Sequence, residues 1–237
     1  MILLQKIKRK FFKPKELLKV YSHPRSGTHF LEAFLAENFY KNKDLNIPNV
    51  IWGHWSNRKE NTKGNPYGKL FGNHHFADKN NNTKPKLYIY RDGRAVAYSV
   101  WKTNNFIHKD LEGISFSEFL KTKIDWHGTP AVKTQPKYTI IEHWQLHVHS
   151  WLDLAKTDEN LLILKYEDLI DDPYKQYEKI HSKFFRRKRK LTKEKIDIIK
   201  KPLGLLPNKG TKDAWENIFT EKDLNLYDSL ISNKLIK

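Results

Sequence analysis

Short apolar runs alternate with longer helical segments along most of this sequence, and the alternation limits the folds open to it. Residues 17–22, 86–90 and 161–164 are apolar runs of the length of a buried strand, and residues 50–52 and 69–73 are weaker strand candidates. Segments 28–40 and 140–156 instead repeat apolar residues at helical spacing. Strands that alternate with helices are typical of a parallel sheet covered on both faces. The sequence therefore predicts an α/β fold with a parallel central sheet flanked by helices.

The length and composition of the chain suit one domain. Its 237 residues are 38% hydrophobic and 13% aromatic, which provides enough apolar surface to form a core. No shift in composition marks an internal boundary. We therefore expect a single domain over residues 1–237, with residues 1–15 as a basic, flexible N-terminal segment.

Two absences narrow the classes of protein further. Cysteine is missing, which excludes disulfides, thiolate catalysis and zinc sites built from cysteine. No apolar run approaches membrane-spanning length, and the first ten residues hold too few apolar side chains for a secretory signal. We expect an intracellular, cytoplasmic protein without a transmembrane segment.

The chain is strongly basic. Lysine and arginine total 44 against 27 aspartates and glutamates, for a net charge of +17. Such an excess attracts anionic partners, whether nucleotide, nucleic acid, membrane surface or acidic glycan, although an AT-rich genome produces the same bias. The basic run Arg186–Lys190 is more typical of a solvent-exposed helix face or loop than of a sequence-specific nucleic-acid-binding site. We expect no specific nucleic-acid partner; a peripheral anionic surface is a hypothesis that rests on charge alone.

A phosphate-binding loop is predicted between the first strand and the first long helix. Gly27 allows the backbone to approach an anion, and the following helix offers unpaired N–H donors at its N-terminus. Ser26 and Thr28 add hydroxyls and Arg25 adds charge. The loop lacks the first glycine and the lysine of a Walker motif, which disfavours an ATPase or GTPase. The alternative is a Ser-Gly turn that merely caps a helix.

Four segments, in order along residues 20–220, resemble the sulfotransferases that use 3′-phosphoadenosine 5′-phosphosulfate (PAPS). Val20–Phe30 resembles the segment with their Y-P-K-S-G-T-T-W loop, and Leu87–Ser99 their 3′-phosphate segment, in which an Arg and a Ser stand eight residues apart. His147–Leu152, followed by Leu161–Asp168, is similar to their H-V-x-x-W-W and F-Y-E-D-M segments. Asn208–Thr220 resembles R-K-G-x-x-G-D-W-K-N-x-F-T, with one residue of displacement at Ala214. The resemblance implies a P-loop-like, three-layer sandwich.

The resemblance also implies how PAPS is held and which product, adenosine 3′,5′-bisphosphate (PAP), remains. Tyr166 corresponds to the family's adenine contact, or is simply a half-buried aromatic, and Trp151 is assigned to the core. Arg25 stands where the family usually has Lys, and Asn208 puts a neutral side chain where the family has a charged Arg. The residues expected to bind the donor are Arg25, Ser26, Gly27, Thr28, His29, Arg91, Ser99, Tyr166, Asn208, Lys209 and Gly210.

The implied reaction is an in-line displacement at sulfur onto a hydroxyl or amine, with no metal. Arg25 would stabilise the bridging oxygen as its bond to sulfur breaks. The family's catalytic base is a His after a strand, and His74 fits that position best, with His75 and His54 as alternatives. The sequence does not identify the acceptor, for which a carbohydrate is one candidate. It does not identify the oligomeric state either. A basic nucleic-acid-binding protein and a P-loop nucleotide kinase are the alternative functions.

Overall fold

A computed structural model describes residues 17–40, 70–78, 84–102, 113–123, 137–197 and 212–231. Its centre is a sheet of β1 (Lys19–Ser22), β2 (Lys86–Tyr90) and β3 (Leu161–Lys165), in the order β1-β2-β3. Both strand pairs are parallel. The three strands are those predicted from the apolar runs, and the parallel sheet is confirmed.

The register of the sheet sorts the side chains onto two faces. Val20, Leu87 and Leu162 are aligned across the strands and belong to one core cluster. One residue further along each strand, Tyr88 and Ile163 belong to a second cluster on the other face, which includes Trp151. Because successive side chains of a strand point to opposite faces, a sheet with two apolar faces must be covered twice.

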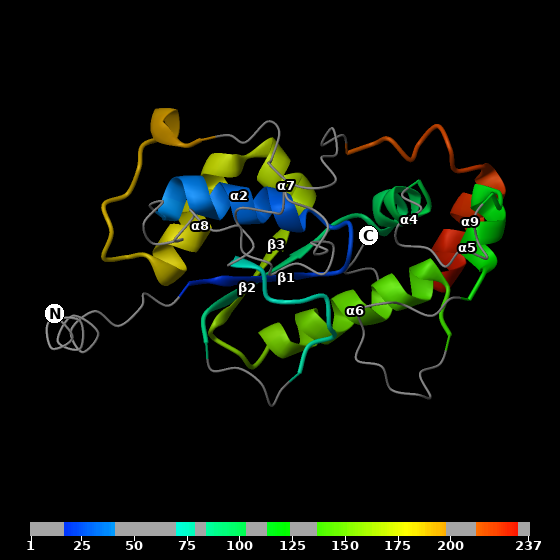
Figure 1. The fold of residues 1–237 in the computed structure, drawn as a ribbon, viewed down its shortest axis with the longest axis horizontal. Helices are drawn as coiled ribbons and strands as arrows, with labels where there is room; N and C mark the ends of the chain where they lie inside the picture. Colours follow the sequence, from blue (N-terminus) through cyan, green and yellow to red (C-terminus); the bar gives the residue numbers. More distant parts are fainter. Residues whose placement is uncertain are drawn as a thin grey trace, which may run out of the picture.

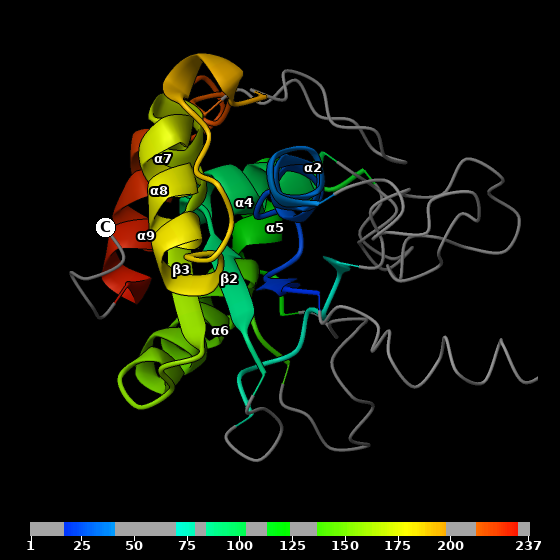
Figure 2. The same ribbon diagram turned by 90° about the vertical axis from the view of Figure 1, so that its left-hand side faces the viewer.

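Helices cover both faces, which completes the predicted three layers (Figures 1 and 2). One face carries α2 (Thr28–Phe39), α7 (Tyr166–Asp171) and α8 (Pro173–Phe184). The other carries α6 (Ile140–Ala155), and its Trp151 is 3% exposed, so the assignment of that residue to the core is confirmed. A third cluster joins α6 to α4 (Gly93–Trp101), α5 (Phe116–Lys121) and α9 (Glu221–Leu230), and η4 (Lys193–Lys195) is a single 3-10 turn.

Local capping explains where several of these helices begin. Thr139 and Glu142 form a capping box at the start of α6, each side chain binding the other residue's backbone N–H. Asp172 caps α8, whose first residue is Pro173. Asp92 caps α4 by accepting from the Arg94 backbone N–H. The helices expected at 28–40 and 140–156 are observed at Thr28–Phe39 and Ile140–Ala155, so their bounds differ little from those expected.

The strand expected at 69–73 is not formed in the described part of that segment, where Phe71 makes only an isolated bridge to Val20. The Gly72 backbone N–H donates to the Val20 carbonyl over 2.8 Å. The next acceptor along β1, the Ser22 carbonyl, is instead bound by the His74 side chain. A side chain therefore takes the acceptor that a continuing strand would use.

Other expectations fall outside the described residues, namely the flexible segment 1–15 and a short strand at 50–52. Within the described part of the chain, no helix has the length and apolarity needed to cross a membrane.

Candidate functional site

The loop between β1 and α2 has the backbone of an anion site. Gly27 is the N-cap of α2 and has φ 92°, in the left-handed region. A Cβ at this position would lie 2.3 Å from Tyr166 Cδ2. Glycine is therefore required twice, by the backbone angle and by the ring packed against it.

Ser26 and Thr28 differ in what their hydroxyls do. Ser26 is fully buried, and its Oγ has no hydrogen-bond partner among the described residues. Thr28 Oγ1 lies 2.6 Å from Ser22 Oγ, so it already has a partner within the protein. A buried, unsatisfied hydroxyl at a helix N-terminus is costly unless a ligand completes it. Ser26 thus fits an anion more directly than Thr28 does.

Arg25 connects this loop to the second predicted cradle. Its φ is 67°, and its Nε donates to Ser99 Oγ over 2.9 Å. Burial, and next the charge of Arg91, lower the pKa of Arg25 to about 10. Arg91 and Ser99 are each 5% exposed. The structure therefore brings the two predicted cradles into contact, with two guanidinium groups close enough to repel each other, and a bound anion would relieve that repulsion.

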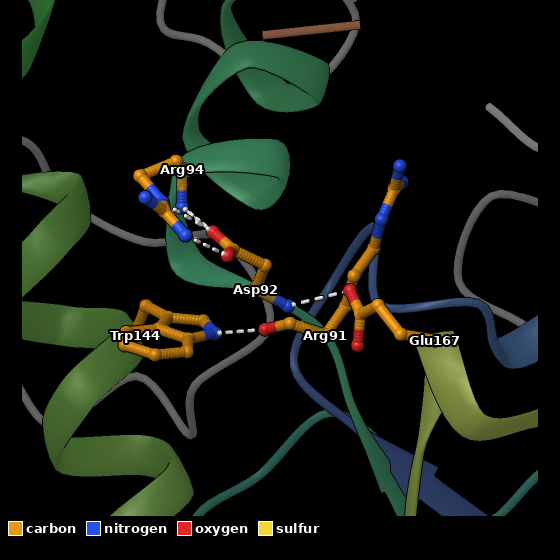
Figure 3. A network of polar contacts seen from close by, with 5 residues as sticks. All are labelled: Arg91, Asp92, Arg94, Trp144 and Glu167. Carbon is orange, nitrogen blue, oxygen red and sulfur yellow. Dashed lines mark hydrogen bonds and ion pairs between the residues drawn. The ribbon is translucent and has the colours of Figure 1, made fainter. Parts of the chain in front are cut away.

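The backbone around Arg91 is fixed on both sides (Figure 3). Trp144 Nε1 donates to the Arg91 carbonyl over 3.2 Å, and Glu167 accepts from the Asp92 backbone N–H over 3.0 Å. Asp92 also forms an ion pair with Arg94. Since α6, α7 and α4 each supply one of these groups, the position of Arg91 depends on three helices.

Arg94 extends this network to the C-terminal segment. Its guanidinium lies 4.0 Å from the centroid of the Trp215 ring and 5.7 Å from that of Tyr227. The Asp92 carboxylate raises the pKa of Arg94, which keeps its charge. The stacked arginine attaches the segment carrying Trp215 to the turn that carries Arg91.

Tyr166 is more enclosed than a typical nucleotide-stacking side chain. It is 4% exposed, with Arg91 Cζ 4.8 Å from its ring centroid and Phe30 edge-on at 5.9 Å. Burial raises the pKa of its hydroxyl. These contacts give Tyr166 a packing role beside Gly27; the adenine contact stays a prediction.

His74 lies beside the phosphate loop in a defined tautomer. Its Nδ1 is 2.7 Å from the Ser22 carbonyl, which can only accept, so Nδ1 carries the proton and Nε2 a lone pair. Burial is the main cause that lowers the pKa of His74 to about 3. His147 supports it by donating from Nε2 to the His74 carbonyl over 3.2 Å. The imidazole is therefore neutral, as a general base must be before it accepts a proton, although its low pKa makes it a weak base until a nearby negative charge, such as that of a bound anion, raises the pKa.

The remaining candidates are placed less directly. His75 is half-buried; its carbonyl accepts from Trp151 Nε1 over 3.1 Å, and its Nδ1 has no hydrogen-bond partner in the described chain. His29 Nδ1 lies 3.3 Å from Glu32 Oε2, so the structure gives it an acidic neighbour. His54, Asn208, Lys209 and Gly210 lie outside the described residues.

Sequence reasoning missed a buried pair of histidines next to the loop. His23 Nε2 and His143 Nδ1 are 3.0 Å apart, although the residues are 120 positions apart in the chain. Burial lowers the pKa of His23 to about 4 and that of His143 to about 2. No spacing rule signals such a pair. Among the described residues, no group of three or more acidic, histidine or cysteine side chains is arranged to hold a metal ion.

Comparison with known proteins identifies the class to which this fold and site belong. Residues 18–225 match the sulfotransferase domain family, and the chain is a member of that family. It is an enzyme of the sulfotransferase class, and this assignment favours neither the nucleic-acid-binding protein nor the nucleotide kinase considered from the sequence.

Its relatives match it at modest sequence identity over most of the chain. Sulfotransferase 2A6 of Mus musculus is 26% identical over 276 residues, covering 99% of this chain and 89% of that protein. The 3-alpha-hydroxysteroid sulfotransferase of Cavia porcellus is 24% identical, covering 98% and 88%. The amine sulfotransferase of Oryctolagus cuniculus is 23% identical, covering 91% and 67%.

Solved structures agree on the fold. Mouse sulfotransferase SULT7A1, complexed with PAP, superposes with a TM-score of 0.56 at 16% identity and covers 97% of this chain and 88% of its own. Retinol dehydratase, in a complex with retinol and PAP, gives a TM-score of 0.58 at 18% identity and covers 93% and 81%.

Proposed function

We propose that this sulfotransferase takes its sulfuryl group from PAPS and transfers it to a hydroxyl or amine. The contact between Arg25 and Ser99 carries the proposal, because it joins the loop suited to the 5′-phosphosulfate with the segment suited to the 3′-phosphate. The two sulfotransferase-fold structures solved with PAP support the same donor.

In this arrangement the two anionic ends of the donor meet different groups. The N-terminus of α2 and the Ser26 hydroxyl face the 5′ end, where Ser26 Oγ is buried without a partner in the described chain. Arg91 and Ser99 hold the 3′-phosphate, with the planar guanidinium matched to two phosphate oxygens. Lys209 and Gly210 belong to the same proposed contact, as the sequence resemblance implies.

The transfer is an in-line displacement. The acceptor oxygen or nitrogen forms a bond to sulfur while the bond from sulfur to the 5′-phosphate oxygen breaks, and that oxygen leaves with the electron pair as part of PAP. Arg25 and the N-terminus of α2 stabilise the negative charge on the leaving oxygen. Arg25 keeps its proton at ordinary pH, so it acts by charge and not as an acid. A sulfuryl group carries less charge than a phosphoryl group, so we assign no metal to the step.

His74 takes the acceptor's proton on Nε2. Its Nδ1–H is committed to the Ser22 carbonyl, and β1 ends at Ser22, directly before the phosphate loop. His74 therefore contacts the strand end from which the phosphate loop begins, and this proximity supports its assignment as the base. His75 and His54 remain the alternatives to be tested beside it.

The acceptor is the open part of the proposal. Relatives named for a 3-alpha-hydroxysteroid and for amines support a hydroxyl or amine acceptor. A carbohydrate hydroxyl has the same reacting group and belongs in the same screen.

The basic run offers fewer accessible cations than its sequence suggests. Lys188 Nζ donates to the Phe39 carbonyl at the end of α2, and Lys190 pairs with Glu178. Arg186, Arg187 and Arg189 are exposed, and Arg186 Nε donates to the Ser182 carbonyl. A peripheral anionic surface would therefore be contacted mainly through these three arginines, and replacing all three with Gln tests the idea through the salt dependence of acceptor saturation.

A labelled-donor assay tests the proposal. The purified protein is incubated with PAPS labelled in the sulfuryl group and with panels of phenols, steroids, amines and sugars, beside His74→Ala, His75→Ala and His54→Ala. We expect transfer to at least one panel and loss of turnover in His74→Ala, with PAP binding retained. If His74→Ala retains turnover and His75→Ala or His54→Ala loses it, the catalytic base is that other histidine. Turnover of ATP without any response to PAPS would contradict the proposed donor.

A further inference from the structure

Two buried imidazoles connect α6 to the phosphate loop. His23 lies in the loop and His143 on α6, and they are 0% and 3% exposed. His23 Nε2 is 3.0 Å from His143 Nδ1, and the rings meet edge-on with centroids 5.1 Å apart. The mechanism above uses neither side chain.

One carbonyl fixes the order of protons along this pair. His23 Nδ1 is 2.9 Å from the Pro24 carbonyl oxygen, which can only accept, so His23 carries its proton on Nδ1. Its Nε2 is then a lone pair, and the proton between the rings belongs to His143 Nδ1. Burial lowers the pKa of both imidazoles, to about 4 and about 2, which agrees with two neutral rings. The hydrogen bonds therefore run from His143 to His23 and from His23 to Pro24.

The Pro24 carbonyl belongs to the peptide group that immediately precedes the φ torsion of Arg25. That torsion is 67°, and Arg25 is the only non-glycine residue with positive φ in the described chain. The left-handed region is unfavourable for a residue with a Cβ, which stays there only when surrounding contacts hold it. The same residue sends its Nε to Ser99 Oγ. The held carbonyl and the strained angle are thus adjacent on the chain.

We propose that His143 is a positioning residue for sulfuryl transfer: through His23 and the Pro24 carbonyl it holds Arg25 in the left-handed conformation that directs its guanidinium to the donor. This inference rests on the proposed function. His143 touches no reacting atom in this scheme and acts only through Arg25. A role in packing alone would affect stability and leave the contribution of Arg25 to turnover unchanged.

The first test compares two replacements of His143. His143→Phe keeps a ring but removes the donor, whereas His143→Asn retains an N–H near the position of Nδ1. We expect His143→Phe to lower kcat about tenfold, the effect of losing one hydrogen bond that holds a charged group in place. The acceptor KM should not change, and His143→Asn should recover most of kcat. Equal kcat values in the two variants and wild type would overturn the inference.

A double-mutant cycle with Arg25→Ala separates positioning from packing. If His143 acts through Arg25, His143→Phe lowers kcat in the wild-type background but has no further effect once Arg25 is alanine. Equal fold losses in both backgrounds would show that His143 acts independently of Arg25, and the inference would be wrong. The same cycle measured by PAP affinity gives a second readout.

His181→Phe is the matched control. His181 is 9% exposed and its Nε2 is 2.9 Å from the Lys188 carbonyl, so the substitution also removes a buried imidazole contact. It lies on α8, away from the loop, and we expect unchanged kcat and no coupling to Arg25. Turnover of PAPS by the wild-type protein tests the proposed function separately. If the wild-type protein turns over PAPS but the effects of His143→Phe and Arg25→Ala on kcat are independent, only the positioning role of His143 is wrong.

Discussion

Replacing Gly27 with alanine tests whether the phosphate loop and Tyr166 form one unit. The substitution places a Cβ on a residue with φ 92° and 2.3 Å from Tyr166 Cδ2. Gly113 provides a matched control, because its φ is 86° and a Cβ there would have no heavy atom within 4 Å. The two alanine variants share the backbone strain and differ in the contact with the ring.

The structure sets the size of each effect. A left-handed angle costs a residue with a Cβ about 1–2 kcal/mol, so Gly113→Ala should lower the free energy of unfolding by that amount. Overpacking adds roughly 1–3 kcal/mol, so Gly27→Ala should lower it by about 2–5 kcal/mol in total. Arg91 Cζ lies 4.8 Å from the centroid of the displaced ring. We therefore expect PAP affinity to fall at least about tenfold in Gly27→Ala, a difference of about 1.4 kcal/mol, and to be unchanged in Gly113→Ala.

Urea unfolding and calorimetric titration with PAP measure the two quantities on the same preparations. A common loss of stability in both variants, with PAP affinity unchanged in both, would refute the claim that Gly27 accommodates Tyr166 and that the ring positions Arg91.

Three further predictions concern a buried hydroxyl, a buried imidazole and a stacked arginine. Ser26→Ala should leave the free energy of unfolding unchanged or raise it, because the Ser26 hydroxyl has no partner in the described chain. The same substitution should weaken PAP binding about tenfold. Urea unfolding and titration with PAP measure the two effects, and a loss of stability without a change in affinity would contradict the prediction. The folded-state pKa of His23 is about 4 against an ordinary value of 6.5, so below pH 6.5 the unfolded chain binds more protons. The neutral His23 should therefore contribute on the order of 3 kcal/mol of stability above pH 6.5 that is lost toward pH 4, in addition to the losses from His74 and His143, and His23→Phe should reduce the slope of stability against pH in unfolding curves taken across this range. Arg94→Met should loosen Trp215, whose ring lies 4.0 Å from Arg94 Cζ, and shift its fluorescence emission to longer wavelength, whereas an unchanged spectrum would argue against the stacking.

The fold was predictable because its signals are local. Apolar runs of strand length, and the helical spacing of apolar residues in 140–156, are read from residues close together in the chain. The expected strand at 69–73 was wrong for a tertiary reason. The Ser22 carbonyl is bound by the His74 imidazole, and no pattern within that segment reveals which acceptor a distant side chain takes.

The candidate site also has parts that the sequence predicts and parts that depend on the tertiary structure. Each cradle is a local motif, so Gly27 was accessible from the strand, turn and helix pattern, and the pair Arg91 and Ser99 from the family resemblance. Their contact through Arg25 joins residues 74 positions apart, and the His23–His143 pair joins residues 120 apart, so both depend on how the sheet aligns its strand ends. The roles assigned to these residues in catalysis and donor binding remain predictions.

The central claim is that both cradles bind the two ends of one nucleotide, and a titration with PAP and with 5′-AMP tests it most directly. The account predicts one PAP per chain, with 5′-AMP bound at least about a hundredfold more weakly and competing with PAP, because removing the 3′-phosphate forfeits the charge-assisted contacts of Arg91 and Ser99. Ser99→Ala should narrow that difference. Equal affinities for PAP and 5′-AMP, or their simultaneous binding to one chain, would contradict the claim.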